Sequence, residues 1–188
     1  MRLFIFWEAG IVELDDLKSF VKPYYANKDI MHNMWHIELV HKWVDKIIKL
    51  GNYNIDYEKL IYAMFFHGFI YSNGNDIKHW LKMRSFSNDK IEDIIKITWE
   101  SQRNEVPTTV EGKILHDAHI LEGGRTYLVA KTLIAGSVRG QSLLETINYM
   151  KQNVIDKNRC YLPETYSLCD EMNEYAKKFI EELEEDIA

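Results

Sequence analysis

The chain has 188 residues, the length of one domain, and its 46% hydrophobic and 28% charged residues are the composition of a globular protein rather than a disordered one. Its 29 acidic residues outnumber its 23 basic ones. This balance excludes a long nucleic acid as the main partner, because such binding draws on a surplus of Lys and Arg. A small phosphorylated molecule fits the charge balance, since a few placed cations or one metal ion can bind it.

The sequence gives no sign of a membrane-spanning helix, which needs about 20 consecutive, mostly apolar residues. The best apolar runs cover only residues 3–7 and 60–66. The two cysteines, Cys160 and Cys169, form no C-x-x-C motif and are interpreted as free thiols, so we expect a cytoplasmic protein. The apolar strip 3–7 is a candidate contact between copies in a homo-oligomer.

Helical periodicity fills the chain between its few prolines and glycines. Apart from a weak pattern over 3–7, no segment alternates with the period of a strand. Residues 69–78, which contain glycine and asparagine, are predicted to form a loop. We therefore predict an all-α fold, one domain over residues 1–188 with about eight helices, a core at about 31–155 and a C-terminal helix over 164–186. The helical segments are 15–25, 31–50, 57–66, 76–84, 89–102, 107–121, 125–137, 143–153 and 164–185.

Three of these helical segments carry polar side chains that are costly to bury without partners. His36 lies inside the segment 31–50, His67 closes the apolar segment 57–66, and Asp117 has apolar neighbours within 107–121. Two imidazoles and a carboxylate form a plausible set of ligands for a divalent metal, with positions left open for water or substrate. The alternative is that each side chain is hydrogen-bonded separately within a helical core.

The order of these residues resembles the HD-domain superfamily of metal-dependent phosphohydrolases, whose pattern is H…HD…D on an all-helical scaffold. Several segments are similar to segments of that superfamily, and those after residue 108 are similar to one bacterial branch in which an Asp-Ala-Asp-Arg-Leu-Asp run occurs. The similarity covers the chain from about residue 31 to its end. The segments are 32–40, 109–122, 130–136 and 164–185.

The resemblance implies an HD-domain-like helical bundle and hydrolysis of a nucleotide or another small phosphorylated metabolite. It implies a divalent metal that activates water and polarises a phosphoryl oxygen, with His36, His67 and Asp117 as ligands. Lys131 stands where the branch tends to have Arg, so it is a candidate phosphate contact.

Two further side chains are candidate substrate contacts. Arg125 opens a helix directly after Gly123 and Gly124, and helix amino ends bind anions. His32 lies four residues before His36, which places it one turn away on the same helix face.

The sequence departs from the family pattern at a metal ligand. The HD doublet is His67-Gly68 here, so one carboxylate ligand is missing. The reduced charge favours Mn, Fe, Co, Ni or Zn over Mg. A replacement ligand can come from Asp76, His79 or His119, which we rank last because it points away from Asp117 on a straight helix.

The missing carboxylate leaves two functions open. One is an active phosphohydrolase, and the other is a degenerate protein that binds metal or nucleotide without turnover, as a sensor or interaction module. The substitution Gly68→Asp is the sequence-based test between them, since it restores the doublet.

Overall fold

A computed structural model describes residues 14–188, so the predicted contact strip at 3–7 lies outside the described residues. Over this range the chain forms nine α-helices and no strand, which confirms the all-α prediction. None of these helices is long and apolar enough to cross a membrane. The helices are α1 (Leu14–Ala26), α2 (Met34–Gly51), α3 (Tyr57–Phe66), α4 (Ile70–Met83), α5 (Asn88–Glu100), α6 (Val110–Ile120), α7 (Gly124–Val138), α8 (Leu143–Asn153) and α9 (Pro163–Ile187).

Capping side chains explain where several helices begin. Asp56 accepts a hydrogen bond from the backbone of Lys59 at the start of α3, and Thr109 accepts one from Gly112 at the start of α6. Such caps satisfy backbone N–H groups that the first helical turn leaves free. Gly123 separates α6 from α7 with a φ of 67°, a left-handed conformation that suits glycine.

The predicted loop over 69–78 is wrong, because α4 begins at Ile70 and continues to Met83. A non-helical residue, Asn73, marks a kink inside this helix. Ile70, Ile77 and Leu81 are all buried in the core on one side of it. Burial of this apolar stripe outweighs the low helix propensity of the Asn and Gly residues between them.

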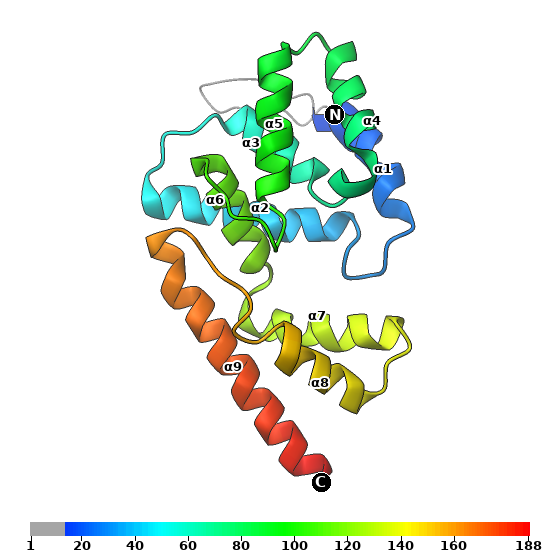
Figure 1. The fold of residues 1–188 in the computed structure, drawn as a ribbon, viewed down its shortest axis with the longest axis vertical. Helices are drawn as coiled ribbons and strands as arrows, with labels where there is room; N and C mark the ends of the chain where they lie inside the picture. The colour runs from blue at the N-terminus through cyan, green and yellow to red at the C-terminus, as the bar shows by residue number, and fades with distance from the viewer. Residues whose placement is uncertain (1–13) are drawn as a thin grey trace.

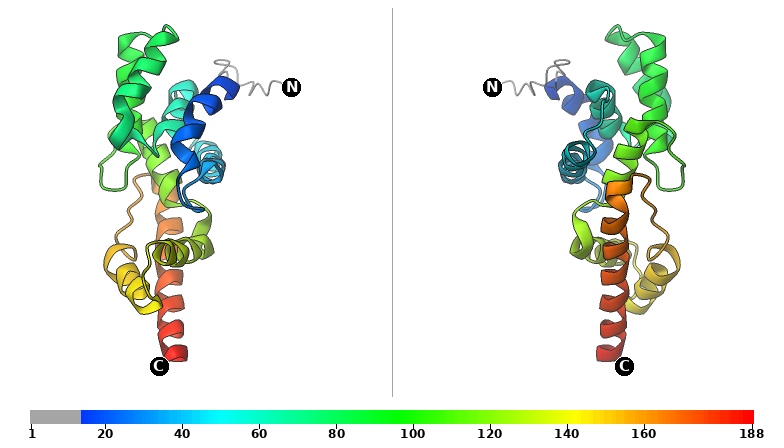
Figure 2. Two further views of the ribbon diagram at one scale, coloured as in Figure 1. Left: turned by 90° about the vertical axis from the view of Figure 1, so that its right-hand side faces the viewer. Right: turned by 90° about the vertical axis from the view of Figure 1, so that its left-hand side faces the viewer.

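Two apolar cores divide the molecule, one among α1–α6 with the beginning of α9 and a smaller one among α7, α8 and α9. Figures 1 and 2 show α7 and α8 in one half of the elongated molecule, and the long helix α9 begins near α2 and runs past α7 and α8 to its C-terminal end. Helix α6 leads directly into α7 through a short turn. The junction of the two cores is therefore the place where side chains from α2, α3, α6 and α7 meet.

Candidate metal centre and adjoining pocket

Three histidines from three helical segments converge at this junction. His36 lies in the first turn of α2, His67 is the residue that ends α3, and His119 lies near the end of α6. One ring nitrogen of each lies within 4.8 Å of the others, and the ring centroids are 4.9–5.4 Å apart. His36 and His67 are buried and His119 is nearly so.

Acceptors outside the cluster fix two of these rings through Nδ1. The Nδ1 atom of His67 lies 2.5 Å from the carbonyl oxygen of Met64 in α3. That of His119 lies 3.2 Å from the carbonyl oxygen of Ser101, just after α5. Both contacts assign the ring proton to Nδ1, which leaves a lone pair on Nε2.

The third ring is held by a buried carboxylate, Glu122, in the turn between α6 and α7. Its Oε1 lies 2.6 Å from His36 Nδ1, and its Oε2 accepts a hydrogen bond from the Lys131 ammonium at 2.6 Å. The Tyr127 hydroxyl donates a third bond, at 3.1 Å. Glu122 is 4% exposed, so these partners are what compensates its burial.

The environment keeps the three imidazoles neutral. Burial lowers the pKa of His67 to about 3, and the neighbouring His36 adds to this effect. Burial also holds the pKa values of His36 and His119 well below the ordinary range, and the Lys131 charge lowers both further. Neutral imidazole is the form that binds metal ions.

This donor set fits a metal ion. The Nε2 atoms of His36 and His67 lie 2.7 Å apart, and the proton of His67 is on Nδ1, toward the carbonyl oxygen of Met64. The unprotonated Nε2 of His67 is therefore on the side of His36, and a neutral imidazole nitrogen of this kind is available to a metal ion. Imidazole ligands that donate their other N–H to a carboxylate or a carbonyl are the usual arrangement at metal sites. The three histidines could therefore hold a metal ion.

The predicted ligand Asp117 lies outside the cluster, and the third side chain near His36 and His67 is that of His119. The Asp117 carboxylate faces away from the imidazoles and accepts bonds from the backbone N–H groups of Tyr161 and Leu162, each at 2.9 Å. The Thr165 hydroxyl donates another at 2.7 Å. Asp117 is therefore paired with the beginning of α9. Of the three replacement candidates, His119, which the sequence ranked last, is the one that lies beside His36 and His67.

The other two suggested replacements also lie outside the cluster. Asp76 is exposed on α4 and accepts hydrogen bonds from Tyr24 and Asn73. His79 is exposed on the same helix. Over residues 14–188 the three imidazoles are the one group of this kind with metal-binding geometry.

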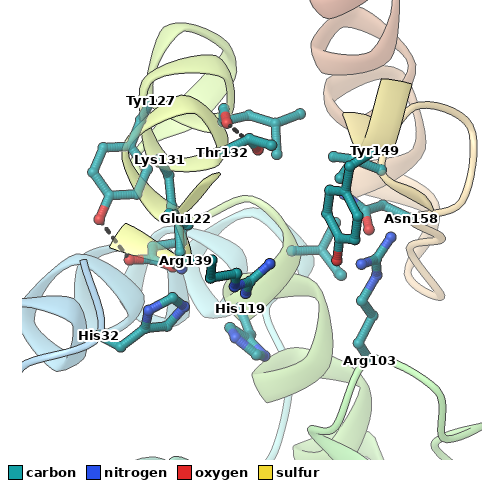
Figure 3. A pocket seen from close by; sticks show the side chains of 14 residues that line it. His32, Arg103, His119, Glu122, Tyr127, Lys131, Thr132, Arg139, Tyr149 and Asn158 are labelled. Atoms are coloured by element: carbon teal, nitrogen blue, oxygen red, sulfur yellow. Dashed lines mark hydrogen bonds and ion pairs between the residues drawn. The ribbon is translucent and has the colours of Figure 1, made fainter. Parts of the chain in front are cut away.

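A pocket of about 200 Å³ opens beside the cluster, between α6, α7, α8 and the loop before α9. Of the predicted substrate contacts, Lys131 and His32 line it. Arg125 does not, because its guanidinium lies over the Tyr175 ring of α9 at 5.5 Å. The pocket residues labelled in Figure 3 are His32, Arg103, His119, Glu122, Tyr127, Lys131, Thr132, Arg139, Tyr149 and Asn158.

Sequence reasoning missed three of the charged pocket residues. Glu122 matches the last Asp of the family's Asp-Ala-Asp-Arg-Leu-Asp run, so the sequence carried a signal for it. Arg103 and Arg139 had no such signal, because they come from the α5–α6 connection and the end of α7. Together with Lys131, these arginines place three cationic side chains around a pocket that contains one carboxylate.

The space beside Gly68, where the family's doublet has its Asp, is filled by Tyr25. The Gly68 N–H donates to the Tyr25 hydroxyl at 3.1 Å, and that hydroxyl donates to the carbonyl of Phe65 at 3.0 Å. The Lys28 ammonium donates to the Gly68 carbonyl. A Cβ atom at position 68 would lie 2.5 Å from the Tyr25 hydroxyl oxygen. A phenol and an ammonium are therefore packed around this glycine.

Solved structures share this fold, although no protein-family model matches the sequence and no curated protein matches it. Bacillus subtilis YpgQ in complex with ADP has a TM-score of 0.71 at 18% identity, over 92% of this chain and 97% of that one. YpgQ crystallised alone gives 0.71 over 92% and 94%. The Lin1889 protein of Listeria innocua gives 0.68 at 19% identity, over 93% and 94%. These similarities establish the helical fold.

Proposed function

We propose that this chain is a metal-dependent phosphohydrolase of the HD-domain type, acting on a nucleotide or another small phosphorylated metabolite. The observation that carries the proposal is the convergence of three neutral imidazoles at the wall of a cationic pocket. The ADP in the complex of YpgQ, which has the same fold, supports a ligand of this class.

The proposed metal ligands are His36, His67 and His119. A divalent ion held there would supply Lewis-acid activation of water and of a phosphoryl oxygen. Three neutral nitrogen donors favour a borderline transition metal such as Zn, Co, Ni, Fe or Mn over Mg, which prefers oxygen ligands. Glu122 fixes the ring of His36 and so positions the first ligand.

The proposed substrate contacts are the cationic side chains around the pocket. Lys131 lines the pocket beside Glu122 and can bind a phosphate while it remains paired with that carboxylate. Arg103 and Arg139 line the side next to Tyr149, where a second anionic group of the substrate would lie (Figure 3). Two free cysteines agree with a cytoplasmic setting for such a protein.

Binding without turnover is the second candidate function, and Gly68 is the observation that favours it. With a phenol where the family has a carboxylate, the site has one anionic ligand fewer, and Lys28 adds a positive charge nearby. Such a site can still hold a metal and an anion, but it has lost a group that takes part in the family's metal binding.

The test combines metal analysis with a turnover screen. We expect the purified protein to bind about one equivalent of Zn²⁺ or Co²⁺, and to release phosphate or pyrophosphate from one of a panel of nucleoside mono-, di- and triphosphates. His36→Ala, His67→Ala and His119→Ala should each abolish metal uptake, whereas Asp117→Ala should retain it. Metal and nucleotide binding without product would select the second function. A protein that takes up no metal would contradict the first function, and one that also binds no nucleotide would contradict both.

A further inference from the structure

Asp29 and His32, on the loop between α1 and α2, form a hydrogen-bonded pair beside the cluster of three histidines. The Nδ1 atom of His32 lies 2.8 and 2.9 Å from the two carboxylate oxygens of Asp29. The Met31 N–H donates to Asp29 Oδ1 at 2.8 Å, and the His32 N–H donates to the Asp29 carbonyl at 3.0 Å. The carboxylate is thus fixed by the backbone, and the imidazole is fixed by the carboxylate.

This pairing turns the other edge of the His32 ring toward the pocket. His32 lines the pocket together with Glu122 and Lys131, and Figure 3 shows its ring on their side of the opening. Its ring centroid lies 6.1 Å from that of His36, so it is next to the cluster without belonging to it. With Nδ1 bound to Asp29, Nε2 is the ring nitrogen available to a ligand.

The surroundings favour the proton-accepting form of this ring. Burial lowers the pKa of His32, and the Lys131 charge lowers it further, while Asp29 acts in the opposite direction. A neutral ring that donates from Nδ1 to a carboxylate presents a lone pair at Nε2. A carboxylate in this position also stabilises the imidazolium that forms when the ring accepts a proton.

We propose that His32 is the catalytic base of this site and that Asp29 is its positioning residue, an inference that depends on the proposed hydrolytic function. A water oxygen forms a bond to phosphorus while the bond from phosphorus to the leaving oxygen breaks. The proton of the water passes to His32 Nε2, and it is then given to the leaving oxygen or to solvent. His32 lies on the loop just before α2, with its ring centroid 6.1 Å from that of His36, so the water would attack at the pocket wall that His32 and His119 share.

The first experiment measures kcat and KM for His32→Gln with the best nucleotide of the panel and with 4-nitrophenyl phosphate. Loss of a general base lowers the rate by about 100-fold or more. We expect this loss in kcat with both substrates, because 4-nitrophenolate leaves without protonation and still requires an activated water. His79→Gln, a histidine exposed on α4, is the matched control and should behave like the unchanged protein.

The second experiment separates chemistry from structure. Added imidazole should restore at least 10-fold of the lost kcat in His32→Ala, and Asp29→Asn should lower kcat by about 10- to 100-fold with metal content unchanged. Metal content is measured for every variant. Turnover by the unchanged protein together with an unaltered kcat in His32→Gln would overturn this inference alone. No turnover by metal-loaded unchanged protein would overturn it together with the proposed hydrolysis.

Discussion

Asp117 shows how a single residue can have the right neighbours in sequence and a different role in the structure. Its carboxylate is fully buried and accepts hydrogen bonds from Tyr161, Leu162 and Thr165. We expect Asp117→Ala to lower the free energy of unfolding by about 3 kcal/mol, because it leaves several buried donors without an acceptor. Urea denaturation measures this loss. A change below about 0.5 kcal/mol would show that these bonds contribute nothing to stability.

The sequence predicts part of the site, because two of the three histidines stand out by their position in the chain. His36 and His67 were identified because each is a polar residue in an otherwise apolar helical context, in the order of a known motif. His119 was ranked behind Asp117 because the two cannot face the same way on one helix, and that geometric argument holds. The rotation of α6 decides which of them faces the site. Packing against α2 and α5 fixes that rotation, and the α6 sequence alone does not.

Gly68→Asp, the sequence-based test of activity, meets an obstacle in the structure. A Cβ atom there lies 2.5 Å from the Tyr25 hydroxyl and 2.8 Å from two ring carbons. We expect Gly68→Ala and Gly68→Asp each to destabilise the protein by about 1–3 kcal/mol, since overpacking forces neighbours to move. Tyr25→Phe should reduce the additional cost of either change. Thermal unfolding of the single and double variants measures how the two substitutions affect each other. Purely additive losses of stability would contradict a contact between residue 68 and the Tyr25 hydroxyl.

The first part of α4, before the predicted helical segment 76–84, is what sequence reasoning missed, and its stability offers a test. A Cβ atom at Gly74 would meet only Ile70 Cδ1, at an ordinary 3.7 Å. We therefore expect Gly74→Ala to stabilise the protein by about 0.5–1 kcal/mol, because alanine has the higher helix propensity. The loop interpretation predicts no such gain. The midpoint of urea denaturation measures the difference, and destabilisation would contradict a helix through residue 74.

The start of α6 depends on a buried carboxylate from the neighbouring helix α5. Burial alone would raise the pKa of Glu100, but hydrogen bonds from Thr108 and Thr109 lower it below its ordinary 4.5. A group with a lowered folded-state pKa stabilises the fold above pH 4.5 and loses this contribution as the pH falls below it.

The corresponding variant is Glu100→Gln, which keeps the shape of the side chain and removes its charge. We expect it to cost about 1.5–3 kcal/mol at pH 7, the range for hydrogen bonds to charged groups, and clearly less near pH 3. Chemical denaturation of both proteins across this pH range gives the difference. An equal cost at every pH would show that the charge of Glu100 is irrelevant. His119 lies in the helix that Glu100 caps through Thr108 and Thr109, so this contact also supports the position of the third imidazole.

On the scale of the whole molecule, the predicted fold class and most helices agree with the structure, while the division into two cores was not predicted. Apolar periodicity shows that a helix buries one face, but it does not identify the partner helix. The smaller core joins α7 and α8 to the second part of α9, and the pocket lies where it meets the larger core. The pocket is lined by Ile120 of the larger core and Val154 of the smaller one, so a ligand bound there would contact both.

Metal binding should therefore stabilise the molecule as a whole, because one ion would hold α2, the end of α3 and α6 together. A ligand that binds only the folded state at 100 times its Kd adds about 2.7 kcal/mol. For a domain of this size that raises Tm by about 5–10 °C. We expect Zn²⁺ or Co²⁺ to give this shift and Mg²⁺ to give little. His119→Gln should abolish the shift. Arg125→Gln should retain it, because the Arg125 guanidinium lies over Tyr175 of α9, outside the pocket. An equal shift in both variants would mean that the ion binds elsewhere.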